Sequence, residues 1–150
     1  MRPEIRPLAP ADAPRVQDFV RQLSPQARRE RYFCAIRELS PRQLARLTGG
    51  TDARNLCLGA FHGEALVGLA EYADSEFGVV VADAWQGAGL GRRLMQCLVA
   101  HAAQQRSRAL HGLVRAGNRA MLHLAATLGF HIGRDSDPEL VRVELPLAHA

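Results

Sequence analysis

The stretch WQGAGLG (Trp85–Gly91) places three glycines and an alanine between two segments of regular pattern. The apolar run FGVVVA (77–82) before it predicts a strand, and the apolar spacing of LGRRLMQCLVAHAA (90–103) after it predicts a helix. A strand that leads into a helix through glycines leaves backbone N–H groups uncovered at the positive end of the helix dipole. The stretch therefore predicts an anion site suited to phosphate, with Arg92 and Arg93 placed to pair with phosphate oxygens.

Two common phosphate-binding motifs do not fit this loop. The P-loop ends in Gly-Lys-Ser/Thr, whereas Arg92 and Arg93 follow the last glycine here. The dinucleotide fingerprint G-x-G-x-x-G fails because Gly87, Gly89 and Gly91 are two residues apart, and no ribose-binding acid ends the next strand. A glycine-rich turn that binds nothing stays open as the simpler interpretation.

The rest of the chain alternates between helical and strand patterns, which predicts one mixed α/β (α+β) domain over residues 1–150. Cap residues mark the helix starts, and the strand over 76–82 is apolar enough to predict burial on both faces. Helices are predicted within 9–23 (N-cap Asp12), 24–33 (Ser24), 39–50 (Ser40) and 118–130 (Asn118). Further strands are predicted at 4–8, 55–63, 64–74, 109–116, 130–133 and 140–147, with a hairpin turn at His62–Gly63 and the last two strands paired.

Composition excludes several classes of function. The net charge is +4, and the basic residues, all arginine, gather in the first 50 positions without interleaved aromatics or a known nucleic-acid motif, so we expect no nucleic-acid partner. No apolar stretch is long enough to span a membrane and no signal peptide begins the chain, so we expect a cytoplasmic protein with no membrane partner. Three cysteines and six histidines lack ligand spacing, so we expect no metal.

The segment Gln86-Gly87-Ala88-Gly89-Leu90-Gly91 resembles the Q/R-x-x-G-x-G/A signature of the GCN5-related N-acetyltransferases (GNAT). A strand–Asn118–helix unit that closes with LGF (128–130) follows in the order typical of that family, and the resemblance extends from Ile5 to Leu147. It implies a mostly antiparallel sheet of about six or seven strands flanked by four or five helices. It also implies that the loop amides, with Arg92 beside them, hold the pyrophosphate of the co-substrate acetyl-CoA.

The resemblance also implies where the chemistry takes place. Val79, Val80 and Val81 would hold the pantetheine arm through their backbone. Asn118 would cap a helix and also touch the coenzyme or a loop, and a role as cap alone stays open. Among the nearby carboxylates, Glu76 stands ten residues before Gln86, about where the family carries its general base, and Glu71 is the second choice. Many members carry a tyrosine as general acid where this chain has Ala125, so the resemblance leaves the general acid unassigned.

A narrower likeness concerns the acceptor. LSPQARRERYF (23–33) and ELSPRQLARLT (38–48) are similar to the first helices of the bacterial Pat-type protein-lysine acetyltransferases, which acetylate acyl-CoA synthetases. This implies a protein lysine as the acceptor amine. A small-molecule amine acetyltransferase and a non-catalytic acyl-CoA sensor remain as alternatives, and a monomer and a homodimer are both open.

Overall fold

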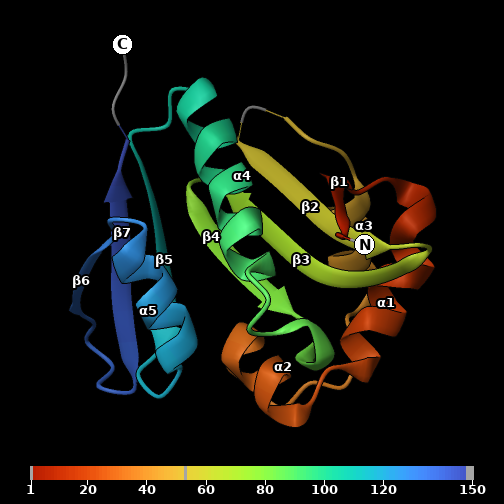
Figure 1. Cartoon of the computed structure of the whole chain (residues 1–150), viewed down its shortest axis with the longest axis horizontal. Coiled ribbons are helices and arrows are strands. Elements are labelled where there is room, and N and C mark those ends of the chain that lie inside the picture. Colours follow the sequence, from red (N-terminus) through yellow and green to blue (C-terminus); the bar gives the residue numbers. More distant parts are fainter. Residues whose placement is uncertain (1, 53, 148–150) are drawn as a thin grey trace.

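The computed structural model describes residues 2–52 and 54–147, which form one seven-stranded sheet in the order β1-β2-β3-β4-β5-β7-β6 with helices on both faces (Figure 1). The strands are β1 (Glu4–Pro7), β2 (Asn55–His62), β3 (Ala65–Ala73), β4 (Glu76–Val81), β5 (Ala109–Arg115), β6 (His131–Arg134) and β7 (Leu140–Pro146). The helices are α1 (Ala13–Gln22), α2 (Pro25–Tyr32), α3 (Pro41–Thr48), α4 (Leu90–Gln104) and α5 (Arg119–Thr127). Neighbouring strands are antiparallel except β4 and β5, so the predicted mixed, mostly antiparallel fold is confirmed.

Three of the predicted helix caps are confirmed. The Ser24 hydroxyl accepts a hydrogen bond from the N–H of Ala27 (3.1 Å), and Ser40 and Gln43 form a reciprocal capping box at the start of α3. The side-chain oxygen of Asn118 accepts a hydrogen bond from the N–H of Met121 (3.2 Å) at the start of α5. A proline follows each serine at the first helical position, where its missing N–H costs nothing.

Asp12 occupies the N-cap position of α1 as predicted, but its carboxylate makes no cap bond to that helix and instead accepts two hydrogen bonds from the guanidinium of Arg6 (2.8 and 2.9 Å). A charged partner competes more strongly for a carboxylate than an amide does. The β2–β3 turn consists of Gly63 and Glu64, one residue later than predicted, because His62 still pairs with Ala65 and glycine takes the left-handed position with φ +63°.

The sheet separates two apolar cores. On one face, α4 and α5 pack against the sheet with Leu94, Met95 and Leu98 fully buried, and Figure 1 shows α4 crossing the strands on this side. On the other face, α1, α2 and α3 contribute a second cluster that includes Val16 and Leu69. Along β4, Val79 and Val81 pack with the first core and Val80 with the second, so this strand borders both helical layers.

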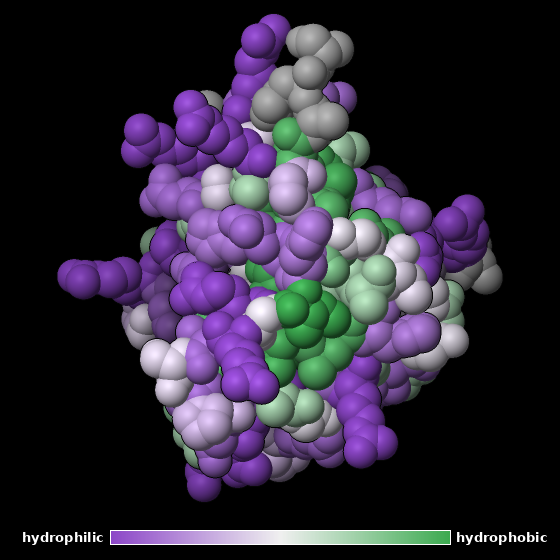
Figure 2. Space-filling model, turned by 90° about the vertical axis from the view of Figure 1, so that its left-hand side faces the viewer, coloured by the Kyte–Doolittle hydropathy of each residue, from purple (hydrophilic) through white to green (hydrophobic). Residues whose placement is uncertain are grey.

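The β6 end of the molecule is the open edge of the sheet. All four residues of β6 are exposed, and Ile132 keeps 50% of its surface in contact with solvent. Seen from that side, the surface is largely hydrophilic around one apolar area (Figure 2). Within residues 2–52 and 54–147, no helix is long and apolar enough to cross a membrane, and no three His, Cys, Asp or Glu side chains gather as metal ligands would.

Candidate active site

Strands β4 and β5 are neighbours at one end only. Their register holds the single parallel pair Glu76–His111, whereas β3 accompanies β4 along its whole length. Beyond Glu76, the edge of β4 that faces β5 therefore has no strand partner in the described part of the chain. Backbone N–H and C=O groups along 77–81 need partners, and a ligand that enters between the two strands can supply them.

The glycine-rich segment forms the turn that leads into α4. Gly87 and Gly89 have φ values of +80° and +84°, a left-handed conformation that favours glycine, and a Cβ on either would meet no atom within 4 Å. Gly89 is the N-cap of α4 and carries no side chain that could accept from the amides of the first turn. Those amides therefore remain available to an anion at the positive end of the helix.

A groove of about 430 Å³ extends from this turn along β4. Its walls include all but one of the residues predicted to bind the coenzyme: Val79, Val80, Val81, Gln86, Gly87, Gly89, Leu90, Gly91, Arg92 and Asn118. The exception is Ala88, which lines a separate hollow on the other side of the turn beside Arg2 and Pro3. Ala88 belongs to the same turn but does not line the groove.

The two arginines after the turn point in different directions. Arg92 lines the groove and donates a hydrogen bond to the hydroxyl of Thr127 at the end of α5 (2.8 Å). Arg93 donates instead to the carbonyl of Pro3 (3.0 Å), near the start of the chain. Of this pair, therefore, only Arg92 is placed beside the glycine turn on the groove side.

A second cavity, of about 420 Å³, adjoins the groove and shares Arg31, Val79 and Asn118 with it. Glu76, the predicted general base, lines this cavity at the start of β4. Its side chain is exposed, and within the described residues its carboxylate has no hydrogen bond or ion pair. Glu71 lines the same cavity from β3, so both carboxylates considered from the sequence face one space.

Glu71 is held by two arginines. It is buried, and its carboxylate accepts hydrogen bonds from Arg31 of α2 and from Arg46 of α3, the latter at 2.9 Å. The thiol of Cys57 lies 3.8 Å from the same carboxylate. Burial, together with the negative charge of Glu71, raises the pKa of Cys57 to about 12, so this thiol stays protonated and is no nucleophile.

Burial of β4 on both faces was predicted and is wrong. Val80 is buried, but Glu76 is exposed and Phe77, Gly78 and Val79 are half-buried. The reason is that one face of the strand opens into the second cavity while its free edge borders the groove. An apolar run beside a ligand cavity has the same sequence pattern as one inside a core.

Helices α2 and α3 contribute cavity residues that no sequence motif predicted. Arg31, Phe33 and Arg46 form part of its wall, and Phe33 ends α2 with a left-handed φ of 63° and 43% of its surface exposed. Arg31 and Phe33 belong to the basic segment ARRERYF (27–33), but a basic helix is more often a solvated surface. His123, on α5, also lines the groove.

The model of the acetyltransferase (GNAT) family matches residues 17–130. The chain belongs to the GNAT family. Acetyltransferase PA5475 of Pseudomonas aeruginosa is 35% identical to this GNAT chain in an alignment of 143 positions, and the alignment covers 89% of this chain and 77% of that protein. The protein is therefore an acetyl-CoA-dependent acetyltransferase, and an amine is the acceptor class of such GNAT enzymes.

Solved structures agree on the fold. The GNAT domain of S. lividans PAT superposes with a TM-score of 0.90 at 24% identity, covering 97% of this chain and 90% of that one. The putative acetyltransferase yncA of Salmonella typhimurium, solved with acetyl-CoA, gives 0.78 at 19% identity, covering 100% and 96%. Spermidine N-acetyltransferase from Vibrio cholerae, solved with CoA and spermine, gives 0.75 at 16% identity, covering 97% and 95%.

No tyrosine of this GNAT chain lines the groove. Ala125 is fully buried in the core beside α4, and the hydroxyl of Tyr72 is paired with Nδ1 of His101 (2.5 Å) on that side of the sheet. The Tyr32 hydroxyl is buried without a hydrogen-bond partner in the described residues, and burial raises its pKa. Neither tyrosine substitutes for the family's usual acid.

Proposed function

We propose that the protein transfers the acetyl group of acetyl-CoA to the side-chain amine of a lysine in a protein, with Glu76 as general base. The observation that carries the proposal is the continuity of two spaces. The groove beside the glycine turn and the cavity that contains Glu76 share Arg31, Val79 and Asn118. A co-substrate held at one end and an amine held at the other would meet beside β4.

Glu76 is suited to accept a proton. A lysine amine has an ordinary pKa near 10.4, so it enters a site at neutral pH protonated and must lose that proton before it can attack. The Glu76 carboxylate is unpaired within the described residues, whereas both oxygens of Glu71 already accept hydrogen bonds from arginines. A third carboxylate in the cavity wall, Glu30, accepts a hydrogen bond from the side-chain amide of Gln26 (2.9 Å). Glu76 is therefore the carboxylate with no partner among the described residues, and it is free to take the proton, directly or through water.

The other groups of the site would position and polarise the co-substrate. Acetyl-CoA supplies an activated thioester, so the protein needs no nucleophile of its own. The amides of the glycine turn and Arg92 would bind the pyrophosphate, and backbone groups of Val79, Val80 and Val81 would hold the pantetheine arm at the free edge of β4. An ordinary thiol pKa near 8.5 allows the thiolate to leave without a tyrosine acid.

The likeness to the S. lividans PAT domain supports a protein lysine as acceptor, since it covers 97% of this chain at a TM-score of 0.90. The cavity wall contains three carboxylates, Glu30, Glu71 and Glu76, beside the guanidinium groups of Arg31 and Arg46. Its charge therefore suits a positively charged amine, whether that amine belongs to a protein lysine or to a small molecule.

The test is release of free thiol from acetyl-CoA in the presence of lysine peptides and of purified acyl-CoA synthetases. The Glu76→Gln variant should lower kcat by about 10²- to 10⁴-fold, while calorimetry should show acetyl-CoA binding as in the wild type. Glu64→Gln, in the exposed β2–β3 turn, is the matched control and should keep full activity. A Glu76→Gln enzyme with normal kcat would disprove the role of Glu76, and acetylation of free amines alone would disprove the lysine acceptor.

A further inference from the structure

We infer that Arg31 and Arg46 form a subsite for a carboxylate that the acceptor carries close to its reactive amine. The inference rests on the proposed function and describes how the same cavity selects its lysine. An aspartate or glutamate beside that lysine would supply the carboxylate, and a free amino acid would supply the same group.

The first argument is charge. Two guanidinium groups converge on the single carboxylate of Glu71, and both arginines line the cavity. Arginine does not lose its proton in proteins, so the cluster of Arg31, Arg46 and Glu71 has a net charge of +1. Glu30 and Glu76 also line the cavity, but within the described residues neither forms an ion pair with these arginines. The side chain of Arg46 is 54% exposed, which leaves this charge accessible from the cavity.

The second argument is unused hydrogen-bond capacity. A guanidinium has five N–H donors. Within the described residues, Arg31 donates to Glu71, while its Nε is buried and has no acceptor. A buried donor without an acceptor is unfavourable, and an incoming anion next to the two arginines would give this cluster the acceptors that Glu71 alone does not provide.

The third argument is placement. The Arg31 guanidinium lies against Gly78 of β4, where a Cβ would come within 2.4 Å of it, so the charge is fixed beside the strand that carries Glu76. Glu76 and Gly78 are two residues apart on one face of β4, a separation of about 7 Å. A lysine amine at Glu76 and a carboxylate of the neighbouring residue at the arginines can span such a distance.

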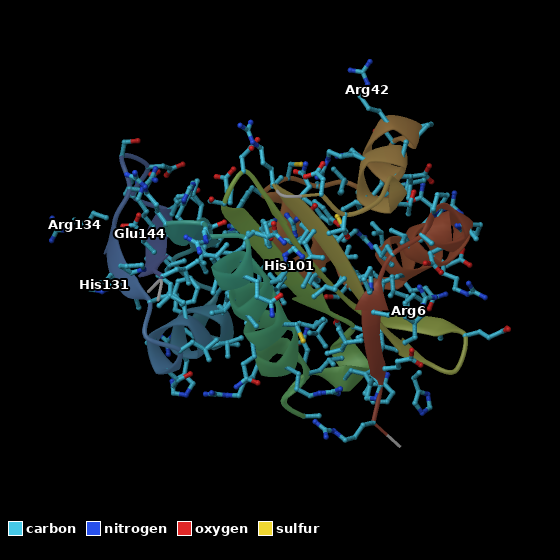
Figure 3. All side chains as sticks on the ribbon, turned by 90° about the horizontal axis from the view of Figure 1, so that it is seen from above. Arg6, Arg42, His101, His131, Arg134 and Glu144 are labelled. Atoms are coloured by element: carbon cyan, nitrogen blue, oxygen red, sulfur yellow. The ribbon has the colours of Figure 1, made fainter. Side chains whose placement is uncertain are left out.

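The experiment uses two pairs of acceptors that differ by one negative charge. The peptide pair is acetyl-Asp-Lys-Ala amide and acetyl-Asn-Lys-Ala amide, and the non-peptide pair is 6-aminohexanoate and 6-aminohexanamide. For each pair, the ratio of kcat/KM between the acidic and the neutral member is measured with wild type, Arg46→Gln and Arg42→Gln. Arg42 lies on the same helix, outside the cavity, and projects from the end of α3 away from the sheet (Figure 3).

We expect wild type and Arg42→Gln to prefer the acidic member by about tenfold or more, and Arg46→Gln to lower that ratio toward one. Arg46→Lys keeps the positive charge but lacks the planar guanidinium, so it should retain part of the preference. It replaces Arg46→Gln in the experiment if that variant does not fold. Calorimetry with the four acceptors gives the ratio of binding affinities within each pair, and we expect the same preference there without turnover. Equal use or equal binding of both members by wild type overturns the inference, as does an unchanged ratio in Arg46→Gln.

Failure of the proposed function gives a different result. If the aminohexanoate pair shows the preference while neither peptide is acetylated, the lysine acceptor is wrong, and the carboxylate subsite belongs to a small amino acid. If both peptides are acetylated at the same rate, the lysine acceptor is supported and the subsite is wrong.

Discussion

The guanidinium of Arg31 lies directly over Gly78, so that a Cβ at position 78 would stand 2.4 Å from its central carbon and 2.6 Å from its Nε. The side chain of Arg31 also forms an ion pair with Glu71 of β3 and borders both the groove and the second cavity. Because Gly78 has no side chain, the guanidinium of Arg31 from α2 can lie directly against β4 at this position.

Gly78→Ala should displace the Arg31 guanidinium and weaken its ion pair with Glu71. Such crowding in a packed site costs about 1 to 3 kcal/mol of stability, and the acceptor KM should rise because the cavity wall moves. Urea unfolding and acceptor kinetics measure the two effects. Gly133→Ala in β6 is the control, because a Cβ there meets its nearest neighbour at 3.9 Å. Equal behaviour of the two variants would show that the contact with Arg31 is unimportant.

Gly89→Ala tests the turn that precedes α4. The added methyl group forces an L-residue into φ +84°, at a cost of about 1 kcal/mol, and it would stand where the pyrophosphate is proposed to approach the amides. We expect acetyl-CoA affinity by calorimetry to fall by about tenfold or more. Gly63→Ala carries the same backbone penalty at φ +63° in the β2–β3 turn and should leave affinity unchanged. A similar affinity for both variants would contradict an anion site at this turn.

Arg92→Gln tests the charge at the same end of the groove. Loss of a charged hydrogen bond to the pyrophosphate should raise the Kd for acetyl-CoA by about tenfold, and the remaining affinity should depend less on salt concentration. Arg93→Gln removes the neighbouring charge but only breaks the bond to the Pro3 carbonyl, so its Kd should stay close to that of the wild type. Equal losses in the two variants would mean that general electrostatic attraction, rather than a contact of Arg92, holds the coenzyme.

The strand, the glycine turn and the cap at Asn118 were predictable because each depends on residues within a few positions of one another. A left-handed φ, such as those of Gly87 and Gly89, favours glycine, so the glycines in the sequence indicate where the backbone adopts it. The family signature then places these local elements in one order along the chain.

The walls of the second cavity were not predictable in the same way. Arg31 and Arg46 lie 40 and 25 residues from Glu71 in the sequence and meet it only because α2 and α3 pack on one face of the sheet. Such long-range ion pairs follow from the tertiary fold rather than from a local pattern. The pair between Arg6 and Asp12 is local, but the cap pattern at Asp12 indicates only its position before α1 and not that its carboxylate binds Arg6 of β1.

The ion pair between Asp12 and Arg6 should make stability depend on acid pH. Hydrogen bonds from Arg6 lower the pKa of Asp12 from 3.8 to about 2 in the folded protein, against the opposing effect of burial. The unfolded chain therefore binds a proton first as pH falls, so the contribution of this pair is complete above about pH 4 and is lost as pH falls through about 2. Because Arg6 is partly exposed, this contribution is about 1 to 2 kcal/mol after allowance for solvent screening.

Asp12→Asn should thus destabilise the protein by roughly that amount at pH 6, and the difference from wild type should shrink between pH 4 and pH 2. Urea unfolding at pH 6, 4, 3 and 2 measures the free energy of unfolding for both proteins. Asp18→Asn on α1, whose exposed carboxylate lies 3.9 Å from Arg21, is the control and should change stability by less than about 0.5 kcal/mol. A difference between Asp12→Asn and wild type that stays constant down to pH 2 would show that Asp12 acts through packing, since a loss of charge pairing must titrate with its carboxylate.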